Sequence, residues 1–243
     1  MVSRSSRTFV LVHGAWHGGW CWVRVAERLQ AAGHRVFTPT LTGLGDRAHL
    51  LSPDVGLDTF IEDVVGTLET GGLTDTILVG HSFGGVPITG AADRMPDRIA
   101  QLVYLDAMLP QDGRSVFDLV APELAAERRR QAQATSGVLA LPPPPASAFG
   151  VKAPADVEWL ERRLRPQPLR GYEDRLRLRH PFGNGLTITY IACTEPPYAL
   201  LLPIHEYARR QPGWRYLELA TGHDAMVTAP AELAEILIEI ADR

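Results

Sequence analysis

Short runs of apolar, often β-branched residues alternate along this chain with longer stretches in which apolar residues recur every three or four positions. This alternation is typical of a parallel sheet whose strands are connected by helices. The apolar runs predict six strands, at 8–12, 34–39, 76–80, 99–106, 186–193 and 214–219. Helical spacing predicts helices at 22–32, 58–69 and 230–241.

The region from about residue 110 to residue 181 interrupts this rhythm. It contains four consecutive prolines at 142–145, which favour an extended segment, and a short helical pattern at 155–164. A poorly ordered linker is one interpretation, but the region is too rich in large apolar side chains for that: Phe117, Leu119, Phe149, Trp159 and Leu164. We therefore expect residues 1–109 and 182–243 to form a core, and residues 110–181 to form a cap inserted over the ends of the strands.

A serine lies at the end of the third predicted strand, in the sequence Gly80-His81-Ser82-Phe83-Gly84. A plausible helix follows at Gly85. Glycines two residues before and after a serine, between strand and helix, are the pattern of the nucleophile elbow in the α/β-hydrolase fold. The turn is strained, and small neighbours let the backbone pass while the hydroxyl points out of the sheet. The pattern predicts Ser82 as a nucleophile.

A serine hydroxyl needs a base to accept its proton, and histidine is the usual base near neutral pH. In this fold the histidine follows the last strand, which favours His223 in the sequence Thr221-Gly222-His223-Asp224. His205 fits less well because it lies in a predicted helix. We expect the His81 side chain to pack beside the strand.

The acid that orients His223 has two candidates, each at the end of a predicted strand. Asp106 ends the strand that follows the elbow helix, whereas Glu195 follows the strand after the cap. We favour Asp106, since the acid must hold the imidazole rigidly and a shorter side chain at a strand end is a stiffer support. Glu195 precedes Pro196-Pro197, which could turn it either way.

The glycine-rich loop after the first strand reads His13-Gly14-Ala15-Trp16-His17-Gly18-Gly19-Trp20. In this fold an oxyanion is held by the amide after the nucleophile and by an amide of an early loop. These positions predict the Phe83 and Ala15 amides as the two donors. A phosphate-binding loop is the alternative, but the glycine spacing matches neither the dinucleotide nor the P-loop pattern. Trp16 and His17 are expected to shape the substrate pocket.

The loop at 13–20, the elbow at 80–85 and the segment Gly222-His223-Asp224-Ala225-Met226 together resemble the plant methylesterase and hydroxynitrile lyase group of α/β-hydrolases. The chain is also similar to bacterial relatives of the carbendazim-hydrolysing esterase type, including residues 159–169 of the predicted cap. The resemblance implies an α/β-hydrolase fold, a mostly parallel sheet of about six strands flanked by helices, and a catalytic triad.

Two departures from the plant group carry information. Plant members place the acid as an aspartate near a Cys-Thr-Glu sequence, but here Pro196 stands at that place after Cys193-Thr194-Glu195. This favours Asp106, a position resembling the one that some haloalkane dehalogenases use. Hydroxynitrile lyases resemble one another in having a lysine directly after the catalytic histidine, where this chain has Asp224, and its single lysine is Lys152 in the cap.

The chain of 243 residues is 45% hydrophobic and 21% charged, with a net charge of −4. This balance disfavours nucleic-acid or membrane-surface binding, and no uninterrupted apolar stretch is long enough to span a membrane. Cys21 and Cys193 lie far apart, which predicts free thiols in a cytoplasmic protein. We expect a serine hydrolase of a small apolar ester or carbamate that requires no cofactor or metal. A lyase or other tailoring enzyme and a non-catalytic binder are the alternatives, and the oligomeric state is not predicted.

Overall fold

A computed structural model describes residues 6–135 and 137–242 of the chain. Its centre is a six-stranded sheet in the order β2-β1-β3-β4-β8-β9, and every neighbouring pair of these strands runs parallel. The strands are β1 (Thr8–Val12), β2 (Arg35–Phe37), β3 (Thr76–His81), β4 (Ile99–Leu105), β8 (Thr187–Cys193) and β9 (Arg215–Leu219). The predicted fold class, a mostly parallel sheet of about six strands flanked by helices, is confirmed.

The strand order places the loops that follow β1 and β3 next to each other. The chain passes from β1 outward to β2, then crosses back and continues through β3 to β4 on the other side. Because successive connections diverge there, the carboxyl ends of β1 and β3 mark the place where open parallel sheets usually bind ligands. All six residues of β3 are buried, as expected for a central strand covered on both faces.

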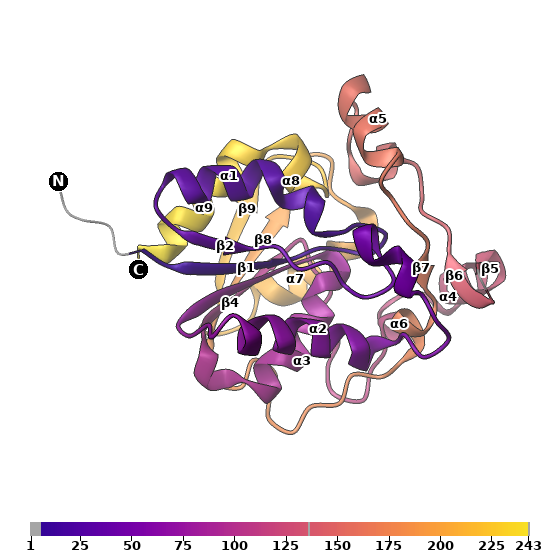
Figure 1. Cartoon of the computed structure of the whole chain (residues 1–243), viewed down its shortest axis with the longest axis horizontal. Coiled ribbons are helices and arrows are strands. Elements are labelled where there is room, and N and C mark those ends of the chain that lie inside the picture. Colours follow the sequence, from indigo (N-terminus) through magenta and orange to yellow (C-terminus); the bar gives the residue numbers. More distant parts are fainter. Residues whose placement is uncertain (1–5, 136, 243) are drawn as a thin grey trace.

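Helices cover both faces of the sheet (Figure 1). On one face lie α1 (Val23–Ala31), α8 (Ala225–Thr228) and α9 (Pro230–Ala241), and on the other lie α2 (Leu57–Thr70) and α3 (Gly85–Arg94). A further helix, α7 (Leu202–Arg209), connects β8 to β9. The apolar face of α2 buries Phe60, Ile61, Val64, Val65 and Leu68, the residues whose spacing predicted this helix.

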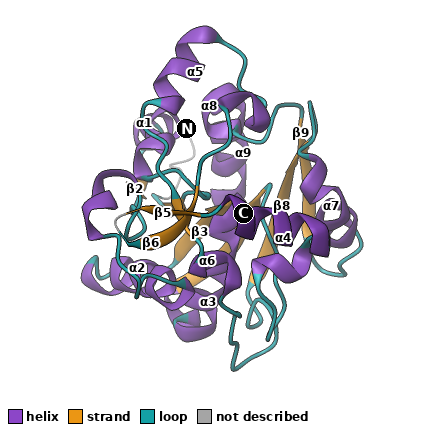
Figure 2. Cartoon of the chain, turned by 90° about the vertical axis from the view of Figure 1, so that its right-hand side faces the viewer, coloured by secondary structure: helices purple, strands orange, loops and turns teal. Residues whose placement is uncertain are grey.

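The chain between β4 and β8 forms a separate group of elements beyond the carboxyl ends of the central strands (Figures 1 and 2). It contains α4 (Pro122–Gln131), β5 (Gln133–Thr135), β6 (Val138–Leu141), α5 (Pro154–Glu161), β7 (Gln167–Pro168) and α6 (Arg170–Glu173). The strands β5, β6 and β7 form a small antiparallel sheet. This whole group lies within the stretch predicted as a cap, and the proline run directly follows β6.

Observed element ends differ modestly from the predicted ones. The second strand was expected at 34–39, but β2 is confined to Arg35–Phe37. The N–H of His34 bonds to the Leu29 carbonyl oxygen, outside the ladder. The helix expected at 155–164 is α5, which ends at Glu161. No helix in the described part of the chain combines the length and the apolar character needed to cross a bilayer.

Candidate active site

Ser82 lies where β3 meets a short 3₁₀ turn at Ser82–Gly84, just before α3. Its φ angle is +53°, a left-handed value that is costly for a residue with a side chain. Gly80 and Gly84 must both be glycine, because neighbouring backbone atoms leave no room for a side chain at either position. A Cβ on Gly80 would lie 2.6 Å from the Gly84 carbonyl oxygen, and one on Gly84 would lie 2.7 Å from the carbonyl oxygens of Val12 and His13. The strained turn predicted from the glycine pattern is therefore present.

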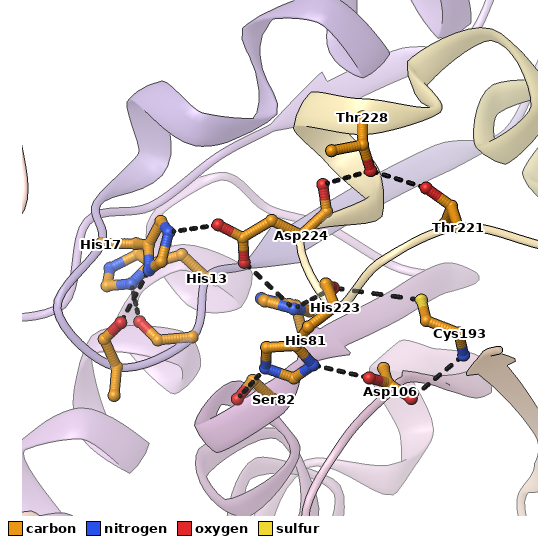
Figure 3. Close-up of polar contacts among 12 residues, drawn as sticks. His13, His17, His81, Ser82, Asp106, Cys193, Thr221, His223, Asp224 and Thr228 are labelled. Carbon is orange, nitrogen blue, oxygen red and sulfur yellow. Dashed lines mark hydrogen bonds and ion pairs between the residues drawn. The ribbon is translucent and has the colours of Figure 1, made fainter. Parts of the chain in front are cut away.

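His223, in the loop between β9 and α8, connects Ser82 to Asp106. The Nε2 atom of His223 lies 2.9 Å from the Ser82 hydroxyl oxygen, and its Nδ1 lies 2.6 Å from Oδ2 of Asp106 (Figure 3). The ring of Tyr198 stacks on the imidazole with its centroid 4.5 Å away. The three side chains form one buried, hydrogen-bonded series from hydroxyl to imidazole to carboxylate.

Asp106 directly follows β4 and is fully buried, with a φ angle of +42°. Besides His223, its carboxylate accepts a hydrogen bond at 3.0 Å from the backbone N–H of Cys193 and one at 2.6 Å from Nε2 of His205. Burial alone would raise the pKa of this carboxyl, but the hydrogen bonds from His205, His223 and Cys193 outweigh it and hold the pKa well below its usual range. Asp106 is therefore ionised at neutral pH.

Of the two candidate acids, the structure brings only Asp106 to His223. The Glu195 side chain is exposed, and its backbone N–H bonds to the carbonyl of Thr221. His205, which sequence reasoning set aside because of its helical position, extends from α7 to the far oxygen of Asp106. No sequence signal identified this contact, since it depends on how α7 packs against β8.

The loop after β1 is held by a second buried pair, His17 and Asp224. The Nε2 atom of His17 lies 3.1 Å from Oδ2 of Asp224, and its Nδ1 lies 2.7 Å from the Ala15 carbonyl oxygen (Figure 3). Both ring nitrogens thus face acceptors, and only an imidazolium can donate to both. Burial opposes this charge, but the Asp224 carboxylate more than compensates and raises the pKa of His17.

Two further histidines in this region are neutral. Burial lowers the pKa of His13 and that of His81 to about 3 each. His13 accepts the Leu41 N–H at Nε2 and donates from Nδ1 to the Gly14 carbonyl. His81 donates from Nε2 to the His223 carbonyl at 3.0 Å, so its side chain supports the loop that carries His223.

The backbone of the early loop approaches Ser82 closely. A Cβ on Gly14 would lie 2.9 Å from Cβ of Ser82, so this approach requires glycine. Ala15 follows in the same loop, and Phe83 follows Ser82 in the elbow. Among the described residues, no loop or side-chain acceptor takes the amide of Ala15 or of Phe83. In contrast, the Trp16 amide donates to Oε1 of Gln167 at 3.3 Å.

Ser82 and His223 open into a cavity of about 600 Å³. Its walls come from the central fold, from the chain between β4 and β8 and from the loop after β8. The lining residues are Trp16, Ser82, Met108, Val116, Phe117, Val120, Leu124, Arg128, Ala148, Phe149, Tyr172, Pro197, Tyr198, Ala199, Leu200 and His223. Trp16 lines this cavity as expected. His17 does not, because its ring faces Asp224 behind the loop.

One group of described side chains, His81, His223 and Asp224, could geometrically share a cation, since their ligand atoms lie within 4.8 Å of one another. Both nitrogens of His223 are already hydrogen bonded to Ser82 and Asp106. Oδ1 of Asp224 is buried and has no partner within hydrogen-bonding distance, and Nε2 of His81 lies 3.8 Å from it. What this oxygen lacks is a hydrogen-bond donor.

The sheet order, the strained serine turn and the buried serine–histidine–aspartate series are those of an α/β-hydrolase. The model of the alpha/beta hydrolase family matches residues 9–236 of this chain. The chain belongs to this family and is a hydrolase enzyme.

Particular relatives extend over nearly the whole chain. It is 44% identical to the carbendazim hydrolyzing esterase of Nocardioides sp. (strain SG-4G) over 94% of this chain and 97% of that protein. It is 28% identical to methylesterase 7 of Arabidopsis thaliana over 100% of this chain and 99% of that one. Among solved structures, it is similar to an extracellular α/β-hydrolase from a Paenibacillus species, described as homologous in structure and function to tobacco salicylic acid binding protein 2. That match has a TM-score of 0.82 and 27% identity and covers 96% of this chain and 98% of the other.

Proposed function

We propose that this protein is a serine hydrolase that cleaves a small, largely apolar carboxylic ester or carbamate through an acyl-enzyme intermediate. The observation that carries the proposal is the series Ser82–His223–Asp106, with contacts of 2.9 Å and 2.6 Å at the floor of an apolar cavity. The esterases among the relatives support the same reaction class.

In the first half-reaction, Ser82 gives its proton to Nε2 of His223 while its oxygen attacks the carbonyl carbon. The imidazolium that forms is stabilised by Asp106, whose carboxylate is ionised and holds the Nδ1–H. His223 then passes the proton to the departing alcohol or amine as the bond to the carbonyl carbon breaks. The acyl group stays on Ser82.

The negative charge that develops on the carbonyl oxygen needs donors that point at it in advance. The backbone N–H groups of Ala15 and Phe83 suit this role. Phe83 follows Ser82, Ala15 follows the Gly14 that approaches Ser82, and neither N–H has a loop or side-chain acceptor among the described residues. The His17–Asp224 pair supports Ala15 by holding its carbonyl oxygen from behind.

In the second half-reaction, His223 takes a proton from water, whose oxygen attacks the acyl carbon, and then returns the proton to Ser82 as the acid leaves. The apolar walls favour an apolar substrate body. A hydroxynitrile-lyase role is disfavoured because Asp224, and not lysine, follows His223, and because the single lysine is Lys152.

The decisive experiment combines labelling and turnover. A fluorophosphonate should label Ser82, and the purified protein should hydrolyse short-chain p-nitrophenyl esters. Ser82→Ala should lose both, whereas Ser147→Ala, which changes an exposed serine, should keep both. Absence of labelling in the wild type would favour a non-catalytic binder, and labelling without ester turnover would favour lyase or other tailoring chemistry.

The cytoplasmic location is inferred from the two cysteines. Cys21 and Cys193 are both free and buried, and burial raises the pKa of each thiol well above its usual value. Such thiols pack as apolar groups and need no oxidising compartment. Fractionation of the source cells tests this location.

A further inference from the structure

The cavity beside Ser82 is mostly apolar, and three of its polar side chains belong to no part of the Ser82–His223–Asp106 series. These are Arg128 from α4, Tyr172 from α6 and Tyr198 from the loop after β8. The remaining polar lining groups are otherwise engaged: Ser82 and His223 bond to each other, and Nε1 of Trp16 donates to the Leu141 carbonyl oxygen. The wall therefore offers a few hydrogen-bond donors that the reaction itself does not use.

Arg128 differs from the two arginines that follow it. Arg129 pairs with Glu173 at 2.8 Å and lies over the ring of Phe117, and Arg130 pairs with Glu127. In the described part of the chain the Arg128 guanidinium makes no ion pair with a carboxylate, and its single hydrogen bond goes to Oε1 of Gln131 at 3.3 Å. It is half-buried and is the one member of this basic run that lines the cavity.

The two tyrosines add further donors beside this charge. Within residues 6–135 and 137–242, no protein group hydrogen-bonds to the hydroxyl of Tyr172 or of Tyr198. The Arg128 charge acts on both, because it opposes the rise that burial causes in the pKa of each hydroxyl. None of the described residues that line the cavity is an aspartate or a glutamate. The wall thus offers a positive charge and hydroxyl donors to an anion, and it holds no carboxylate that would repel one.

We propose that Arg128, Tyr172 and Tyr198 form a subsite for a carboxylate of the substrate. This inference rests on the proposed function and narrows its substrate class to an ester or carbamate that carries a negatively charged group separated from the scissile carbonyl by an apolar body. The guanidinium supplies the charge and a planar pair of donors suited to a carboxylate, and the tyrosine hydroxyls supply further hydrogen bonds.

The test compares substrates that match in shape and differ in charge. One pair is the p-nitrophenyl monoester of adipic acid and the p-nitrophenyl ester whose acyl chain ends in isopropyl instead of carboxylate. A second pair, with the charge on the alcohol side, is meta-carboxyphenyl butyrate and meta-isopropylphenyl butyrate. In at least one pair the wild type should favour the anion by about tenfold in kcat/KM, the size of one charge-assisted hydrogen bond. The preference should shrink as salt is added.

The variant Arg128→Gln should reduce this ratio to about one, as expected when the charge is lost. Arg130→Gln is the matched control, since it removes the same charge from the same helix at an exposed position away from the cavity, and it should keep the wild-type ratio. Equal turnover of anionic and neutral members in both pairs, or an unchanged ratio in Arg128→Gln, would overturn the subsite. Failure to hydrolyse the neutral and charged esters alike would instead contradict the proposed hydrolase function.

Discussion

Asp106 is shared by two imidazoles, because Nε2 of His205 lies 2.6 Å from its Oδ1 while Nδ1 of His223 lies 2.6 Å from its Oδ2. Each carboxylate oxygen thus has its own histidine, and the plane of the carboxylate is fixed from both sides. We regard His205 as a positioning residue, since it touches Asp106 and does not line the cavity.

Replacing His205 by leucine should therefore lower kcat by about tenfold, the cost of one hydrogen bond to a charged group, with little change in KM. His205→Gln places an amide N–H at a similar reach and should recover most of the lost activity. Steady-state kinetics on a p-nitrophenyl ester checks both. If leucine and glutamine at this position behaved alike, the hydrogen bond would have no part in the rate.

Mutating each of the two candidate acids shows which one acts on His223. Asp106→Asn should reduce kcat by about 10³- to 10⁴-fold, because the carboxylate that stabilises the His223 imidazolium is lost. Glu195→Gln should change kcat less than about threefold, since this side chain is exposed and surface substitutions have small effects. A larger loss for Glu195→Gln than for Asp106→Asn would reverse the assignment. Circular dichroism of each variant controls for folding.

Buried neutral histidines make the fold sensitive to acid. The pKa of His13 falls from 6.5 to about 3 on folding, so between these values the unfolded chain binds more protons than the folded one. The free energy of unfolding should therefore fall as the pH falls below about 6.5, by up to about 1.4 kcal/mol per pH unit for each such histidine.

This slope can be measured by urea unfolding between about pH 4 and about pH 6. His13→Gln keeps an acceptor for the Leu41 N–H but cannot take up a proton, so its slope should be shallower than that of the wild type. His49→Gln changes an exposed histidine and should keep the wild-type slope. Identical slopes in all three proteins would contradict a buried neutral His13.

Two glycines, one tightly packed in the elbow and one in open space on a helix, test the packing around Ser82. A Cβ on Gly84 would meet the carbonyl oxygens of Val12 and His13 at 2.7 Å, whereas one on Gly66 in α2 would meet nothing within 4 Å. Gly84→Ala should cost about 1–3 kcal/mol of stability and about 100-fold in kcat/KM, since it displaces Ser82, the proposed nucleophile. Gly66→Ala should stabilise the protein by about 0.5–1 kcal/mol and keep its activity.

Much of the central fold followed from local pattern. Buried parallel strands read as continuous apolar runs, so β1, β3 and β8 were visible in the sequence within one residue of their ends. The small sheet between β4 and β8 was not, because β7 is only Gln167–Pro168 and its pairing with β6 depends on a distant part of the chain. Strands this short carry no periodicity that a sequence could reveal.

In the candidate site, too, some features could be predicted from the sequence and others could not. Ser82 and His223 could be predicted because strained turns and strand order leave local marks in the sequence. The contacts of His205 with Asp106 and of His17 with Asp224 join residues 99 and 207 positions apart. A histidine in a helix or in a glycine-rich loop gives no local sign of such a distant carboxylate. For this reason the sequence predicts His17 in the pocket wall, whereas in the structure it pairs with Asp224.

The cavity draws its floor and its walls from different stretches of the chain. Ser82, Asp106 and His223 follow three strands of the central sheet, while many of the residues that surround a substrate, including Phe117, Arg128 and Tyr172, come from between β4 and β8. Substitutions in that stretch should therefore change which molecule is accepted while Ser82, His223 and Asp106 keep their places. Laboratory libraries aimed at altered selectivity therefore belong in the stretch between β4 and β8.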